Sequence, residues 1–104
     1  MPPNEEDDNI LRVGGAVTRP EKISAPPPVY TEVARRARLQ GVVVIEAVID
    51  RNGRVTRARV LKGMPLGLDH AALEAVEKWK FKPGMKGGQA VNVRATIEVN
   101  FRLL

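Results

Sequence analysis

The clearest hydrophobic pattern in the chain is at its C-terminal end. In residues 91–103 (VNVRATIEVNFRL) every odd position is apolar and every even position is polar. Alternation with a period of two residues is typical of a strand that buries one face and exposes the other. The sequence therefore predicts a long terminal strand.

Two further strands are predicted in the middle of the chain. Residues 42–50 (VVVIEAVID) are rich in β-branched side chains and are apolar on both faces except at Glu46. Both features are typical of a central strand. The dipeptide Asn52-Gly53 follows and is a strong hairpin turn signal. Residues 55–61 then return as the second strand of the hairpin.

Two helices are predicted from apolar spacings of three and four residues. Over residues 30–40, Thr31 is the expected N-cap and Gly41 the expected stop. Over residues 70–80, Asp69 is the expected N-cap. The aromatic residues Trp79 and Phe81 are expected to attach this second helix to the sheet.

The element order αββαβ predicts an α+β fold, in which a three-stranded antiparallel sheet carries two helices packed on one face. A terminal strand of 13 residues would be about 43 Å long, which is longer than its expected partner strands. Part of it should therefore be unpaired, bent or paired with another chain. A strand at a sheet edge is a natural site for adding another extended chain.

The N-terminal region has a different composition from the rest of the chain. Six of the eight prolines lie within residues 1–28, and residues 5–8 are all acidic. We expect residues 1–25 to be a flexible proline-rich and acidic tether and residues 26–104 to be the folded domain. No apolar run approaches the roughly 18 residues of a membrane span, and no signal peptide is recognisable.

The chain lacks the residues that enzymatic chemistry requires. It has no cysteine, one histidine (His70) and one serine (Ser24). His70 follows the expected helix cap and is predicted to be an exposed residue of the first turn. No metal-ligand spacing and no paired nucleophile and base are present. We therefore expect no catalytic residue, no bound metal, no cofactor and no enzymatic activity.

The net charge of +5 raises nucleic acid as an alternative partner. Small sheets that bind single-stranded nucleic acid usually stack bases on exposed aromatic residues. The polar face of the terminal strand has none, so we read the charge mainly as a solvated surface that favours acidic partners. No nucleic acid is expected, and this function remains the less favoured alternative.

The motifs of the chain together resemble the C-terminal domain of the TonB family, the energy transducers of the bacterial cell envelope. The resemblance covers about residues 26–104 and rests on the order and spacing of several short motifs rather than on any one of them. One departure is Thr31, where the family often has proline. The motifs, as they stand in this sequence, are Pro28-Val29-Tyr30, Leu39-Gln40-Gly41, Ile49-Asp50-x-Asn52-Gly53-x-Val55, Leu68-Asp69-x-Ala71-Ala72, Trp79-x-Phe81-x-Pro83, Gly88 and Phe101-x-Leu103.

The resemblance implies a periplasmic domain that grips the extended N-terminal segment of an outer-membrane TonB-dependent transporter. The full-length protein would be anchored in the inner membrane, where a proton-driven motor complex pulls on a region that precedes this domain. The grip resembles β-augmentation, in which the transporter segment adds a strand beside the last strand. The expected docking edge is the backbone of Asn92, Val93, Arg94, Ala95, Thr96, Ile97 and Glu98.

Two alternatives keep the same edge but change the occupant. An envelope adaptor would use strand-edge binding on a different protein, and a strand-exchanged homodimer would use it on a second copy. Proline at Val93 or Ala95 tests the edge. It should abolish binding if the lost N–H points outward, and it should destabilise the domain if that N–H bonds to the neighbouring strand.

Overall fold

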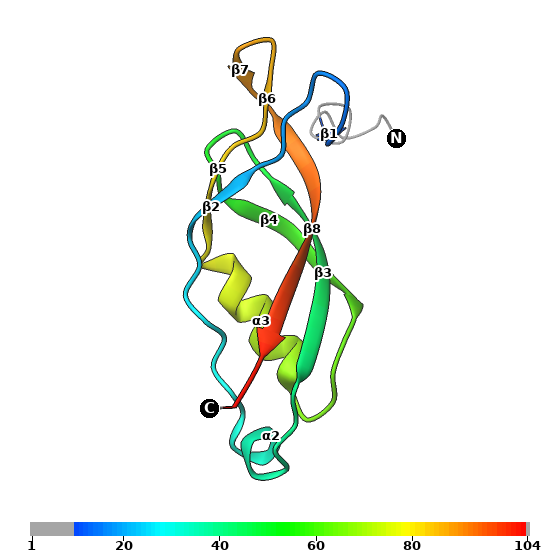
Figure 1. Cartoon of the computed structure of the whole chain (residues 1–104), viewed down its shortest axis with the longest axis vertical. Helices are drawn as coiled ribbons and strands as arrows, with labels where there is room; N and C mark the ends of the chain where they lie inside the picture. Colours follow the sequence, from blue (N-terminus) through cyan, green and yellow to red (C-terminus); the bar gives the residue numbers. More distant parts are fainter. Residues whose placement is uncertain (1–9, 104) are drawn as a thin grey trace, which may run out of the picture.

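The computed structural model describes residues 10–103, which form an elongated molecule with one long twisted sheet (Figure 1). The acidic cluster at residues 5–8 lies outside the described residues. In chain order the elements are β1 (Ile10–Arg12), β2 (Glu21–Ser24), α2 (Glu32–Arg36), β3 (Gly41–Ile49), β4 (Val55–Lys62), α3 (Leu68–Glu77), β5 (Lys80–Lys82), β6 (Met85–Lys86), β7 (Gln89–Ala90) and β8 (Asn92–Phe101).

The main sheet has the strand order β1-β8-β3-β4. The three predicted strands form its antiparallel part, with β3 in the middle between β8 and β4. The prediction of three strands is incomplete, because β1 adds a fourth that runs parallel to β8. The terminal strand is shorter than the expected 13 residues, with ten residues in β8 against nine in β3, and all nine residues of β3 pair with it from Gly41↔Phe101 to Ile49↔Val93.

The core lies between one face of this sheet and α3, which crosses behind β8 and β3 in Figure 1. The odd positions of β3 and β8 supply the sheet side of the core, as the alternation predicts, and Leu68, Ala72 and Val76 supply the helix side. Helix α2 lies at one end of the molecule and adds Ala34 to the same core. The predicted α+β fold with two helices is therefore confirmed.

Of the two predicted N-caps, the structure confirms the one of α2 and not the one of α3. Thr31 caps α2, because its hydroxyl accepts a hydrogen bond from the Ala34 amide at 3.2 Å. The prediction of Asp69 as the cap of α3 is wrong. That helix starts two residues earlier than predicted, at Leu68 behind Gly67, whose φ of 80° favours glycine. The Asp69 carboxylate accepts from the His70 amide instead, at 2.9 Å.

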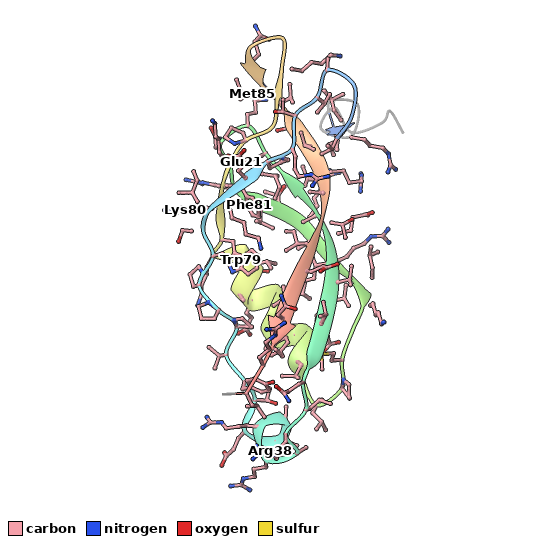
Figure 2. The ribbon with its side chains drawn as sticks, viewed as in Figure 1. Glu21, Arg38, Trp79, Lys80, Phe81 and Met85 are labelled. Atoms are coloured by element: carbon pink, nitrogen blue, oxygen red, sulfur yellow. The ribbon has the colours of Figure 1, made fainter. Side chains whose placement is uncertain are left out.

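Trp79 and Phe81 connect α3 to the strands that follow it, as predicted. They are 5% and 7% exposed, and their ring centroids lie 6.4 Å apart. The Trp79 indole N–H donates a 2.8 Å hydrogen bond to the Pro26 carbonyl, and the Lys22 ammonium lies 5.0 Å from the Trp79 ring. The tryptophan thus holds the N-terminal segment as well as the helix (Figure 2).

The segment expected to be a tether contacts the domain where the structure describes it. Strand β2 pairs antiparallel with β5, and β1 pairs with β8. Between them, the Thr18 amide donates to the Met85 carbonyl at 2.9 Å. Over residues 10–25 the structure therefore shows two paired strands in place of a free tether, while a domain boundary at residue 26 stays a prediction.

The predicted Asn52-Gly53 turn joins β3 to β4 and rests on β5. One Asp50 carboxylate oxygen accepts from the amides of Asn52 and Arg54 at 2.9 and 3.0 Å. The Gly53 carbonyl accepts from the Phe81 amide at 2.8 Å. Gly53 has a φ of 79° and is buried, and its backbone lies so close to that of β5 that there is no room for a side chain.

Replacing Gly53 by alanine should lower the free energy of unfolding by about 2–4 kcal/mol. A Cβ there would lie 1.8 Å from the Phe81 carbonyl oxygen, in addition to the strain of a positive φ. Gly87→Ala is the matched control, because Gly87 has a φ of 59° with nothing within 4 Å of the added carbon. Urea unfolding of both variants separates the steric clash from the backbone strain. Equal losses would contradict the close approach.

Candidate functional site: the open edge of strand β8

The candidate site is the edge of β8 that faces away from β3. Strand β1 covers this edge only at the pairs Ile10↔Asn92, Leu11↔Val93 and Arg12↔Arg94. From Ala95 onward, no strand of the described residues 10–103 pairs with it. The predicted docking edge is therefore divided. Its first three residues already have a strand partner on this side, and the rest, Ala95 to Glu98, have none, so the backbone groups of alternate residues that point away from β3 are open to a partner.

A groove of about 680 Å³ runs beside the unpaired part of this edge. Neighbouring residues of a strand point to opposite faces, so a groove that touches every residue from Arg94 to Glu98 lies at the strand's edge rather than on one face. The opposite wall comes from the N-terminal segment, and Phe81 also lines the groove. The lining residues are Arg12, Val13, Arg19, Pro20, Lys22, Phe81, Arg94, Ala95, Thr96, Ile97, Glu98 and Asn100.

The charges around this groove are mainly positive. Four cationic side chains line it, against the single carboxylate of Glu98. A concave surface with an excess of one charge attracts ligands of the opposite sign. The groove therefore combines free backbone hydrogen-bonding groups with an electrostatic preference for an acidic extended chain. The four cationic residues are Arg12, Arg19, Lys22 and Arg94.

Arg94, a residue of the predicted docking edge, is held by a carboxylate on the solvent face of the sheet. The Glu46 carboxylate accepts hydrogen bonds from Arg59 at 3.1 Å and from Arg94 at 3.2 Å. Glu46 is only 18% exposed, and the hydrogen bond from Arg59, followed by the attraction of both guanidinium groups, lowers the pKa of its carboxyl. Glu46 stays ionised at neutral pH and fixes Arg94 at the mouth of the groove.

The remaining candidate residues do not gather into a second site. His70 lies in the first turn of α3 with a 76% exposed side chain, as predicted, 2.7 Å from Glu74. Within the described residues, no group of three or more His, Cys, Asp or Glu is arranged to hold a metal ion. The arginines are also dispersed. Arg35 and Arg36 end α2, and Arg38 lies at the same end of the molecule (Figure 2), whereas Arg54 lies in the turn before β4 and Arg57 and Arg59 lie in β4.

Sequence reasoning missed the N-terminal wall of the groove. Residues 10–12 and 21–24 are too short to show a period, and their partners are more than 50 positions away in the chain. The one local signal is the apolar pair Ile10-Leu11, followed by the turn residues Gly14-Gly15. An apolar pair before a turn does not by itself specify a strand, and only its pairing with β8 in the structure identifies it as one.

Comparison with known proteins identifies the family. The model for the Gram-negative bacterial TonB protein C-terminal family matches residues 26–103. The chain belongs to this TonB C-terminal family. TonB proteins are energy transducers and not enzymes, so the predictions of the family and of a non-enzymatic role are confirmed.

The relatives agree with the family match. The chain is 41% identical over 78 residues to protein TonB of Xanthomonas campestris pv. campestris, covering 74% of this chain and 35% of the relative. It is 34% identical over 89 residues to protein TonB of Vibrio cholerae, covering 84% and 36%. The chain thus spans about a third of the length of these TonB proteins. No helix within residues 10–103 has the length and apolar character needed to cross a membrane.

A solved TonB structure has the same fold. The solution NMR structure of the Pseudomonas aeruginosa TonB C-terminal domain superposes with a TM-score of 0.65 at 27% identity. The match covers 86% of this chain and 89% of that domain. The matched region is therefore longer than the domain expected at residues 26–104.

Proposed function

We propose that this chain is the periplasmic domain of a TonB-type energy transducer, and that it grips an extended segment of an outer-membrane transporter by strand addition to β8. The observation that carries the proposal is the free edge of β8 from Ala95 to Glu98, bordered by the groove. A partner strand there would satisfy free backbone groups of the sheet. Membership of the TonB family supports the transporter as partner.

The geometry suits a grip that tolerates differences among partner sequences. Backbone hydrogen bonds supply affinity without reading side chains, while pockets beside the edge select among them. Here the selecting groups are the cationic side chains of the groove, which favour a carboxylate in the partner segment. The domain performs no covalent step, so its work is binding and holding under load.

Transmission of force follows from the attachment of the N-terminal segment. In this proposal, a motor complex in the inner membrane pulls on the region that precedes the domain. The pull acts first on β1 and then reaches the rest of the domain through β2, which is paired with β5, and through the Pro26 carbonyl that accepts from Trp79. A strand pulled along its own axis loads several hydrogen bonds together, so the added partner strand resists shear better than peeling.

Amide NMR spectra recorded during peptide titration test this function. The probes are synthetic peptides that copy the extended N-terminal segments of TonB-dependent outer-membrane transporters. We expect the largest shift changes at residues 95–98, next to the free edge. Matched peptides with alternate backbone amides N-methylated keep every side chain but cannot complete the ladder, so their affinity should fall at least tenfold, as expected when more than one hydrogen bond is lost.

The titration also distinguishes the alternatives. Shifts along β8 with peptides from other envelope proteins, but with none from transporters, would indicate an adaptor. Salt-dependent shifts at the arginines with a single-stranded oligonucleotide, and none with any peptide, would contradict strand addition and favour nucleic acid.

A further inference from the structure

The edge that the proposed function assigns to a partner is already used by the chain itself. Strand β1 adds to β8 as a parallel strand at Asn92, Val93 and Arg94. It therefore occupies the first three of the seven residues expected to dock the partner. The chain carries its own short version of strand addition, directly beside the free edge.

We infer that β1 is a displaceable internal strand that competes with the partner for the edge of β8. The inference rests on the proposed function and adds a means of regulation to it. With β1 in place, only the edge from Ala95 onward is open to a partner. With β1 released, the partner gains the backbone groups of residues 92–94 as well.

Several features make β1 easy to release. It is three residues long, and neither Ile10 nor Leu11 is fully buried or belongs to the core cluster. Its last residue, Arg12, is the register partner of Arg94, so the parallel pair places two like charges on neighbouring strands, and like charges repel each other. A strand with so few contacts lies at the low end of local stability.

Release of β1 does not require the rest of the segment to detach. A turn at Gly14-Gly15 follows β1 and is closed by two hydrogen bonds between Gly14 and Val17. Beyond it, the Met85 amide donates to the Thr18 hydroxyl at 2.8 Å, and β2 pairs with β5. These contacts hold β1 close to β8 after release, so it remains a competitor at high effective concentration.

The competition has a measurable cost in affinity. A partner that needs the whole edge binds only the open fraction of molecules, so its apparent dissociation constant rises by the inverse of that fraction. Because pulling on the region upstream of Ile10 draws directly on β1, tension there would remove the competitor. The same pull that the proposed function requires would then extend the binding edge.

The first test weakens β1 in the full chain without touching β8. The double substitution Ile10→Gly and Leu11→Gly removes the two half-buried side chains and lowers strand propensity. Fluorescence anisotropy with a labelled transporter N-terminal peptide should show binding about 5- to 30-fold tighter than for the unchanged chain. Ala16→Gly, in the exposed turn, is the matched control and should bind like the unchanged chain.

The second test locks β1 in place. Arg12 and Arg94 are register partners, and the chain has no cysteine, so Arg12→Cys with Arg94→Cys creates one defined disulfide across the pair. The oxidised form should bind the labelled peptide at least about tenfold more weakly than the same protein reduced. The reduced form is its own control for the loss of both arginines.

Each outcome bears on the inference. Tighter binding by the glycine variant together with redox-dependent binding by the cysteine variant supports it. Equal binding in both comparisons overturns it and leaves the proposed function standing, as does weaker binding by the glycine variant, which would make β1 part of the site. If no form binds any transporter peptide, the proposed function fails and this inference fails with it.

Discussion

Replacing Trp79 by alanine should lower the free energy of unfolding by about 3–5 kcal/mol. The side chain is 5% exposed, belongs to the core cluster and contacts Phe81. Its removal leaves a large cavity where α3, β5 and the N-terminal segment meet. Single domains of this kind are usually stable by only about 5–15 kcal/mol, so the variant should unfold at a much lower urea concentration.

A second variant separates the cavity from the hydrogen bond. Trp79→Phe keeps an aromatic ring in the core but loses the indole N–H that donates to Pro26. It should cost about 1–2 kcal/mol, mostly the lost hydrogen bond and some lost packing. Hydrogen exchange should show faster exchange at β2 in both variants, because both lose the contact that holds the segment after it. A loss below about 1 kcal/mol for Trp79→Ala would contradict its role as an anchor.

The sheet was predictable because its signals are local. Alternation along residues 91–103 and the Asn52-Gly53 turn each specify a strand or hairpin within a few residues. β8, from Asn92 to Phe101, is shorter at both ends than the alternating run, because its pairing with β3 runs only from Gly41↔Phe101 to Ile49↔Val93 and Ile10 adds the pair with Asn92. Periodicity shows which side chains share a face, but only the partner strand decides where pairing ends.

The helix boundaries depended on conformations that residue types only suggest. α2 stops at Arg36 and the chain turns at Arg38, which has a φ of 54°, so the apolar spacing that extends to residue 40 overstated the helix. α3 begins behind Gly67 because that glycine adopts a left-handed conformation. In both cases a residue with positive φ, and not the nearest capping side chain, sets the boundary.

The candidate site was only half predictable for a related reason. The sequence identified the edge strand, since the polar and apolar faces of β8 are explicit in it. It did not identify β1 or the second wall of the groove, because those depend on pairing between residues 10–24 and the C-terminal half of the chain. The alternating pattern identifies the edge strand in the sequence. How much of its edge lacks a strand partner depends on long-range pairing, which only the structure shows.

Proline substitution at adjacent positions of β8 should separate the two edges of the strand. Backbone N–H groups of neighbouring strand residues point in opposite directions, so one of Ala95 and Thr96 directs its N–H to β3 and the other to the free edge. Ala95→Pro and Thr96→Pro therefore remove hydrogen bonds on opposite sides. Both positions lie beyond Arg94, so neither replaces a residue that pairs with β1.

The two variants should fail in different ways. Where the lost N–H bonds to β3, the Pro ring interrupts the central ladder and leaves a carbonyl of β3 without its donor, at a cost of about 1–3 kcal/mol in unfolding experiments. Where it faces the free edge, the domain should keep its stability, since edge positions tolerate proline, and should lose transporter-peptide binding by at least about tenfold. If both variants are stable and bind the peptide like the unchanged chain, the partner does not add to this edge. One of the two substitutions must remove an N–H donor that faces the free edge, and that variant should bind an added strand more weakly.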